Sequence, residues 1–208
     1  GWGQYTWTTN FRRNHLLEFY ANFNKEWGIH HLDVMAGYSW QHFYASDHSV
    51  TYFNETKEQK GEDSRYPFNR REYYLLSFYG RINYSLASKY LFTFTLRDDA
   101  SSRFSKDTRW GLFPSAAFAW NIAQEDFLKD VRAITALKLR LGAGQTGQQD
   151  IFDNYYAHLA RYSMSTDVYK QYNMGNAGYS FYLTPAAYDP NIKWETTTTY
   201  NVGLDFGF

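Results

Sequence analysis

The sequence contains no cysteine, only four prolines among its 208 residues, and no long apolar run. Without cysteine, the chain cannot use thiolate metal ligands, a thiol nucleophile or a disulfide bond. A transmembrane helix needs roughly 20 consecutive apolar residues, and no segment approaches that length. Basic and acidic residues number 21 each, so the formal net charge is zero and no basic excess predicts nucleic-acid binding.

Aromatic residues, in contrast, are abundant. The chain has 20 tyrosines, 17 phenylalanines and 7 tryptophans, which together make up 21% of its residues. The mean hydropathy is -0.62, a value typical of soluble proteins. However, aromatic side chains with one apolar and one wet end are favoured at membrane interfaces. A barrel with a polar lumen, long polar loops and an apolar outer band has the same low average, so the composition favours an outer-membrane barrel.

The strongest pattern is strict alternation at the end of the chain. Large apolar residues occupy every second position, at Tyr200, Val202, Leu204, Phe206 and Phe208. Successive side chains of a strand point to opposite faces, so this segment predicts a strand with one apolar and one polar face. The alternation recurs along the chain, and no helical pattern offers a covering layer. It therefore predicts an all-β fold, a transmembrane antiparallel β-barrel, with about nine or ten strands in this chain.

Connections alternate between short and long. Residues 15–43 predict a hairpin with a tight turn at 24–28, and residues 74–96 predict a second hairpin. Long polar loops are expected at residues 44–70, 98–110 and 164–193, a short separate strand at 2–9, and a weaker strand near 154–163. Outer-membrane barrels have short periplasmic turns and longer extracellular loops, which is the same pattern.

The start of the chain has no secretory leader pattern. It opens Gly1-Trp2-Gly3-Gln4-Tyr5, without an initiator Met, a basic segment or an apolar segment. We therefore expect a processed or partial chain, with residues 1–208 forming part of a barrel and with the signal peptide absent from it.

Four blocks carry a family resemblance. They read RDDASSRF at 97–104, RWGLFPS at 109–115 followed by AWNI and EDF, LKLRLGAGQTGQQDI at 137–151, and DPNIKWETT at 189–197. Together, in this order, they resemble the SusC/RagA group of TonB-dependent outer-membrane transporters of Bacteroidetes. Departures are Ala100, where the family usually has Gly, and Gln148, where it usually has Asn.

The resemblance implies a function that lies mostly outside this segment. Members of the group have an N-terminal plug domain inside a large barrel, and we expect this plug domain to be absent from residues 1–208. They import oligosaccharides or peptides at the expense of the proton-motive force through TonB, and a SusD-like lipoprotein covers the extracellular side. The segment is then barrel wall and extracellular loops in contact with outer-membrane lipid and lipopolysaccharide. The resemblance also favours an internal cut at Phe208, because more barrel normally follows the W-E-T-T strand.

Candidate ligand or lumen contacts are few. Arg97, Arg103 and Arg109 are candidates for an anionic substrate path, although they equally suit lipopolysaccharide phosphates or pairing with nearby aspartates. The Tyr-rich segment offers rings for stacking on sugars or peptide side chains: Tyr169, Tyr172, Tyr179 and Tyr182. No catalytic residue or cofactor site is predicted. His30 and His31 do not predict a metal site either, because their side chains would point to opposite faces of a strand.

Two other readings stay open at this point. One is a small, complete outer-membrane barrel, either a porin or a hydrolase with a rim site near His42, Asp47 and His48. The other is a soluble, aromatic-rich, carbohydrate-binding β-sandwich, in which a second sheet rather than lipid would cover the apolar faces.

Overall fold

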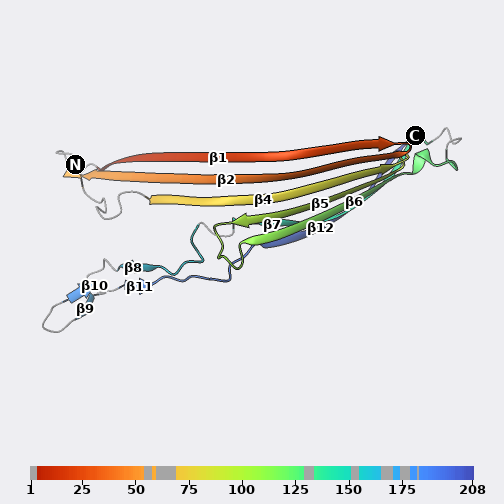
Figure 1. The fold of residues 1–208 in the computed structure, drawn as a ribbon. Helices are drawn as coiled ribbons and strands as arrows, with labels where there is room; N and C mark the ends of the chain where they lie inside the picture. Colours follow the sequence, from red (N-terminus) through yellow and green to blue (C-terminus); the bar gives the residue numbers. More distant parts are fainter. Residues whose placement is uncertain are drawn as a thin grey trace.

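The structure is a computed structural model in which one curved antiparallel sheet dominates (Figure 1). It describes residues 4–53, 58–59, 69–128, 134–150, 155–164, 171–173, 179–181 and 183–208. The strands of the main sheet are β1 (Gln4–Trp27), β2 (His30–Phe53), β3 (Glu58–Gln59), β4 (Asn69–Leu86), β5 (Tyr90–Ser101), β6 (Trp110–Asn121), β7 (Ala136–Gln148) and β12 (Glu195–Gly207). No helix of the described residues is long and apolar enough to cross a membrane.

Neighbouring strands follow the chain order β1-β2-β4-β5-β6-β7-β12, and β3 pairs with the end of β2. All these pairs are antiparallel, so the sheet is a meander of hairpins. Four short strands form two further ribbons: β8 (Tyr162–Met164) with β11 (Leu183–Pro185), and β9 (Gln171–Asn173) with β10 (Tyr179–Phe181). The all-β, antiparallel prediction is confirmed, and the eight-stranded main sheet is close to the expected count.

One face of the sheet, here called the apolar face, is built from the alternating large side chains. The register aligns them in rows across the strands; one row contains Phe23, Val34, Ile82 and Phe94. These side chains are open: Phe94 is 46% exposed and Val202 is 79% exposed. A soluble monomer rarely exposes so large a continuous apolar surface. Within the described residues no second sheet covers it, so a soluble β-sandwich does not fit.

Aromatic rings border the apolar face at two levels. Trp27 stacks on His30 near the tight turns, while Trp40 packs against Tyr74 toward the long loops. On β2, His30 and Trp40 are ten residues apart, or about 33 Å of strand at about 3.3 Å per residue. With a strand tilt of about 40°, this corresponds to a height of about 25 Å, which matches the apolar band of outer-membrane barrels.

The opposite face, here called the polar face, carries small, amide and charged side chains. Asn83 donates to Asp33 at 3.2 Å and accepts from Thr93 at 2.9 Å across three adjacent strands. Arg140 pairs with Asp205 at 2.7 Å between β7 and β12. Since polar groups there satisfy one another or face water, this face suits the lumen of a barrel.

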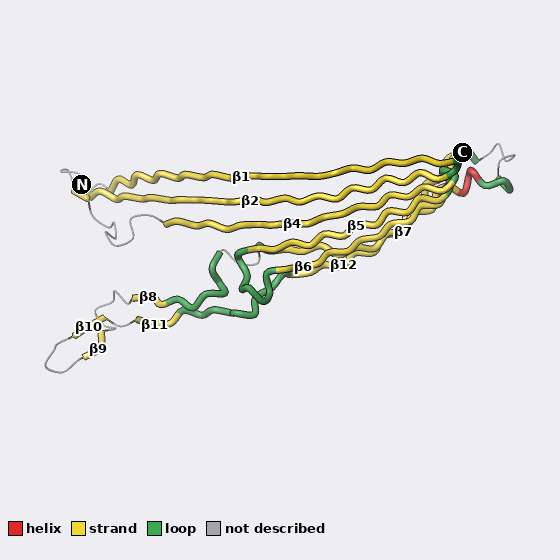
Figure 2. The backbone as a smooth tube through the Cα atoms, viewed as in Figure 1, coloured by secondary structure: helices red, strands yellow, loops and turns green. Residues whose placement is uncertain are grey.

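Tight turns join the strands at one end of the sheet. Gly28, at φ +58°, and Ile29 connect β1 to β2, and the left-handed backbone there favours glycine. Residues 87–89 connect β4 to β5, as the second predicted hairpin required. After β6 the chain makes the helical turn η1 (Ile122–Gln124), drawn in red in Figure 2.

Glu125 holds this end together. Its carboxylate accepts from the Tyr90 hydroxyl at 2.6 Å, from Trp120 Nε1 at 3.0 Å and from Lys89 Nζ at 3.0 Å. The Tyr90 hydrogen bond, then those of Trp120 and Lys89, lower the pKa of Glu125 from 4.5 to about 2. One carboxylate thus ties the Tyr90 and Trp120 rings, at the turn end of the sheet, to the β6–β7 connection.

This cluster predicts an acid-sensitive stabilisation. Because the folded pKa of Glu125 lies below its ordinary value, the stabilisation is complete above pH 4.5 and is lost as the pH falls toward about 2. We expect Glu125→Gln to lower the melting temperature of the intact protein in detergent at pH 7. The difference from the unmodified protein should shrink toward pH 2, as measured by circular dichroism; a difference constant with pH would contradict the assignment.

The other end of the sheet carries the long connections, and two of them fold back over the polar face. Phe104, Phe113 and Trp194 form a buried cluster there, with ring centroids of Trp194 at 5.4 Å from both phenylalanines. Trp194 Nε1 donates to the Arg109 carbonyl at 2.8 Å, and the Thr108 hydroxyl donates to the Ile192 carbonyl at 2.6 Å. The loop after β5 is therefore fastened to the segment that leads into β12.

Several sequence boundaries were wrong. The expected loop at 44–70 begins too early, because β2 continues to Phe53; residues 54–57 and 60–68 lie outside the described residues. No separate strand precedes the first hairpin, because β1 is continuous from Gln4. The expected loop at 98–110 starts only after Ser101. Of the weaker strand expected near 154–163, residues 155–158 form a turn and only 162–163 lie in a strand, β8.

Candidate functional site

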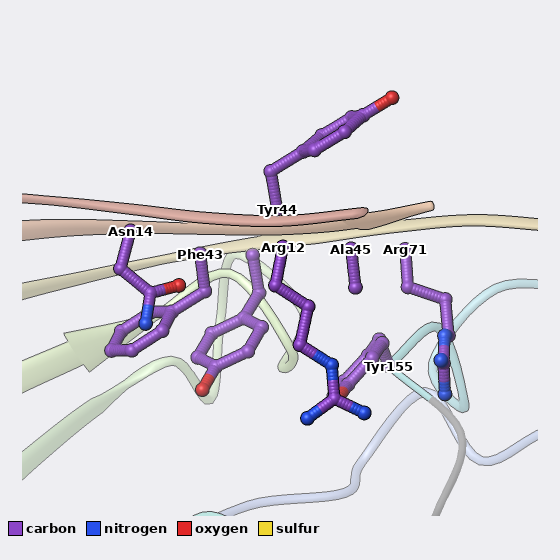
Figure 3. A pocket seen from close by; sticks show the side chains of 8 residues that line it. Arg12, Asn14, Phe43, Tyr44, Ala45, Arg71 and Tyr155 are labelled. Carbon is purple, nitrogen blue, oxygen red and sulfur yellow. The ribbon is translucent and has the colours of Figure 1, made fainter. Parts of the chain in front are cut away.

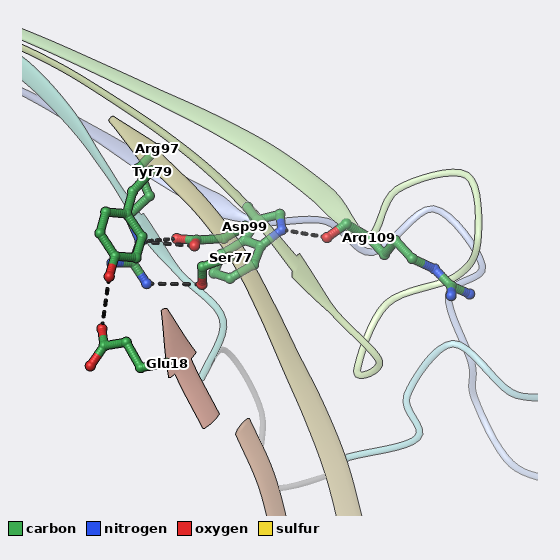
Figure 4. Close-up of polar contacts among 7 residues, drawn as sticks. Glu18, Ser77, Tyr79, Arg97, Asp99 and Arg109 are labelled. Atoms are coloured by element: carbon green, nitrogen blue, oxygen red, sulfur yellow. Dashed lines mark hydrogen bonds and ion pairs between the residues drawn. The ribbon is translucent and has the colours of Figure 1, made fainter. Parts of the chain in front are cut away.

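The three candidate arginines lie in different environments. Arg97 is on the polar face of β5, where its Nε donates to Asp99 at 2.8 Å and its Nη2 donates to Ser77 at 3.0 Å. Beside it, the Tyr79 hydroxyl donates to Glu18 at 2.9 Å, which completes a network across the three strands β1, β4 and β5 (Figure 4). Arg97 thus lies on the polar face, where Asp99 already neutralises its charge.

Arg109 contributes its backbone rather than its side chain to the packing. Its carbonyl accepts from Trp194 Nε1 and from the Ser101 amide. In Figure 4 its guanidinium points away from the Arg97 network. The structure therefore does not bring Arg109 together with Arg97.

Arg103 lies in the strongest concentration of rings and charges on the polar face. Its side chain is 5% exposed and donates to Asp150 at 2.7 Å. Its guanidinium lies 4.7 Å from the ring centroid of Tyr155 and 5.6 Å from that of Tyr73. Cation–π attraction of this kind holds both rings in place. Of the three predicted arginines, Arg103 alone borders the pocket described next.

A hollow of about 240 Å³ opens beside these rings, on the polar face toward the long loops (Figure 3). Its lining, here called the Arg12–Tyr155 pocket, consists of Arg12, Asn14, Phe43, Tyr44, Ala45, Arg71, Tyr73 and Tyr155. Phe43 stacks on Tyr73 at 4.6 Å, and Tyr73 stacks on Tyr155 at 5.2 Å. Strands β1, β2 and β4 thus supply one wall, and the segment after β7 supplies the other.

Neighbouring loop contacts fix Tyr155 against the strands. The Tyr156 hydroxyl accepts from the Glu72 amide at 3.2 Å, and His158 Nδ1 lies 2.9 Å from the Arg103 carbonyl. These contacts join residues more than 50 positions apart in the chain, so sequence reasoning missed Arg12, Arg71, Tyr73 and Tyr155. A usable signal exists for Arg12, Arg71 and Tyr73, since they alternate in phase with the polar face.

The structure describes the backbone of two of the four candidate tyrosines, and it does not test whether any of the four contacts a ligand. Tyr172 lies on β9 and Tyr179 on β10, in paired ribbon strands beyond the long-loop end of the sheet. Tyr169 and Tyr182 lie outside the described residues. Their contact with a ligand stays a prediction.

The three candidate residues of a hydrolytic rim site, His42, Asp47 and His48, do not come together in the structure. His42 points to the apolar face, where it stacks on Tyr74 at 4.4 Å. Asp47 is on the polar face and forms an ion pair with Arg71, and His48 is six residues along β2 from His42. His30 and His31 likewise separate, toward Tyr84 and Glu26 respectively. Among the described residues, no group of three or more His, Asp or Glu side chains is arranged to hold a metal.

Comparison with known proteins identifies the family. Residues 2–208 match the family described as TonB dependent receptor-like, beta-barrel. The chain belongs to the TonB-dependent receptors. It is 44% identical over 205 residues to the TonB-dependent receptor SusC of Bacteroides thetaiotaomicron, covering 96% of this chain. It is 38% identical over 213 residues to TonB-dependent receptor P3 of Formosa agariphila, covering 98% of this chain.

Structural similarity agrees with the sequence comparison. A chain of the RagAB peptide importer in its closed-closed state superimposes with a TM-score of 0.80 over 99% of this chain, at 21% identity. The resemblance to the SusC/RagA group is therefore confirmed. The chain spans 20% of the length of each of these two curated relatives and 23% of the RagAB chain.

Proposed function

We propose that this chain is part of the wall of an outer-membrane transporter that imports oligosaccharides or peptides in a TonB-dependent manner. The observation that carries the proposal is the two-faced sheet, with an apolar face of membrane height and a polar face toward which the long loops fold. Membership of the TonB-dependent receptors supports it, as does the structural likeness to a peptide importer. TonB would act through regions outside this chain, and lipid and lipopolysaccharide would cover the apolar face.

In this proposal the wall has a positioning role and performs no covalent chemistry. The loops fastened by Trp194 keep the extracellular end of the polar face in one shape. A substrate captured there, beneath a SusD-like surface lipoprotein, would pass along the lumen once TonB moves the plug. The Arg12–Tyr155 pocket lies on the polar face toward the long loops, which is the entry side of that path.

Uptake assays test the proposal. Deleting the full-length gene is expected to abolish accumulation of labelled oligosaccharides or peptides, and removing TonB is expected to have the same effect. Restoring the gene should restore uptake, and an affinity tag on the receptor should copurify a surface lipoprotein. Uptake that persists without TonB would indicate a porin and would overturn the proposal.

The partial-chain expectation has its own test. We expect the native product, extracted from outer membranes with detergent, to have an intact mass several times the 24.6 kDa of this chain. A mass near 24.6 kDa would mean that residues 1–208 form a complete protein, and the importer proposal would fail.

A further inference from the structure

The charges around the Arg12–Tyr155 pocket do not balance. Arg71 forms an ion pair with Asp47, and Arg103 forms one with Asp150. Arg12 also lines the pocket, yet within the described part of the chain no carboxylate lies within ion-pair distance of it. The pocket is therefore left with the positive charge of Arg12.

A second guanidinium group also has unused hydrogen-bonding capacity. Arg71 uses Nη2 for Asp47, but its Nε is buried and has no hydrogen-bond partner among the residues that the structure describes. That nitrogen is enclosed, so a ligand acceptor would meet the exposed part of the Arg71 side chain, which lines the pocket and is 33% exposed. Figure 3 shows Arg12 and Arg71 on the same side of the sheet, flanking Tyr155, while Tyr44 points to the opposite side.

The rest of the lining is rich in hydrogen-bonding groups and poor in apolar ones. Asn14 supplies an amide, and Tyr73 and Tyr155 supply hydroxyls, whereas Phe43 and Ala45 are the apolar members. Its volume of about 240 Å³ lies below the range of about 300–1,000 Å³ typical for drug-sized ligands. The hollow therefore suits a single, hydroxyl-rich unit of a longer chain rather than an apolar peptide side chain.

We propose that the Arg12–Tyr155 pocket binds a carboxylate-bearing sugar unit of an acidic oligosaccharide. The carboxylate lies between the guanidinium groups of Arg12 and Arg71, and the sugar hydroxyls contact Asn14 and the two tyrosine hydroxyls. Arg103 acts as a positioning residue that holds the Tyr73 and Tyr155 rings. This assignment rests on the proposed import function and narrows its substrate class.

Binding to the purified full-length receptor in detergent tests the assignment. The probes are trimers of galacturonic acid and of glucuronic acid, each compared with the same trimer after reduction of its carboxyl groups to alcohols. We expect each acidic trimer to bind at least about tenfold more tightly than its neutral form, since hydrogen bonds to charged groups are the strong ones. The preference should weaken as ionic strength rises.

Two neighbouring arginines provide matched variants. Arg12→Gln is expected to lower affinity for the acidic trimers about tenfold while leaving the neutral trimers unaffected. Arg13→Gln is the control, because Arg13 points to the opposite face, with its guanidinium 5.5 Å from the Tyr44 ring centroid. Both positions are exposed, so both variants should reach the outer membrane at normal levels.

Three results would overturn the assignment: equal affinity for acidic and neutral trimers, equal losses in Arg12→Gln and Arg13→Gln, or tighter Arg12-dependent binding of a hexaglutamate peptide. Transport separates this inference from the proposed function. TonB-dependent uptake that shows no preference for acidic over neutral trimers, and that Arg12→Gln does not change, would keep the function and remove the acidic site. Uronate binding without any TonB-dependent uptake would do the reverse.

Discussion

Replacing Phe94 by arginine is expected to destabilise the inserted sheet by about 2–4 kcal/mol, the cost of an arginine on the lipid face near the bilayer midplane. Phe94 lies on β5, about halfway between the two aromatic borders of the apolar face, in register with Ile82 and Ala116. It is 46% exposed, although it is a large apolar side chain in the middle of a sheet. Such exposure of a large apolar side chain is favourable only if lipid, rather than water, contacts the apolar face.

The adjacent residue Thr93 supplies the control. It lies at nearly the same depth but on the polar face, where its hydroxyl donates to Asn83. Thr93→Arg places the same charge within reach of Asp33 and water, so we expect a change below about 1 kcal/mol, as for most surface substitutions. Phe94→Leu tests whether bulk alone matters and should also be tolerated.

The measurement is the amount of folded receptor in outer-membrane fractions, read from heat-modifiable migration on gels, followed by urea titration of the purified protein in bilayers. Phe94→Arg should be depleted and should unfold at lower urea, while Thr93→Arg should behave as the unmodified receptor does. Equal tolerance of both arginines would mean that lipid does not contact the apolar face.

The same physics explains which strands could be predicted from the sequence. Within the bilayer one face meets lipid and the other meets water, so apolar and polar residues alternate, and β4, β5, β7 and β12 are evident from that period. Outside the bilayer both faces are wet and the period disappears. Strand β2 has 24 residues, far more than the 9–11 that a membrane crossing needs, and its part beyond residue 43 carries no such period.

The contacts of the candidate site could be predicted from the sequence only in part. Arg103 was a candidate because an arginine in a loop beside polar strands can face a ligand. Its actual partners, Tyr73, Asp150 and Tyr155, depend on how loops far apart in the chain fold over the polar face. Alternation places Arg12 and Tyr73 on that face, but no local pattern predicts that Tyr155 meets them there.

Trp194→Ala is expected to release the loop after β5 from the polar face. Trp194 is 8% exposed, packs against Phe104 and Phe113, and donates a hydrogen bond to the Arg109 carbonyl. Truncating a buried tryptophan typically costs about 3–5 kcal/mol, because a cavity remains and packing is lost. In a large barrel this cost should appear as local opening of the loop rather than as global unfolding.

Trypsin reports that opening directly, since Arg103 is 5% exposed and should be protected while the loop is closed. We expect cleavage after Arg103 to rise by about 100-fold or more in Trp194→Ala, because an opening free energy lowered by about 3 kcal/mol raises the open population by that factor. Trp194→Phe keeps most of the packing but loses the hydrogen bond, so its cleavage rate should lie between the two.

The matched control is Trp110→Ala, which removes a tryptophan that is 48% exposed on the apolar face. It should leave cleavage after Arg103 unchanged, although it weakens the aromatic border of the membrane band. If Trp194→Ala left Arg103 as protected as before, then the strands alone would hold this loop. Because Arg103 also positions Tyr73 and Tyr155, opening of the loop should in addition weaken ligand binding at the Arg12–Tyr155 pocket, which links the fastening of the loops to the shape of the proposed substrate entrance.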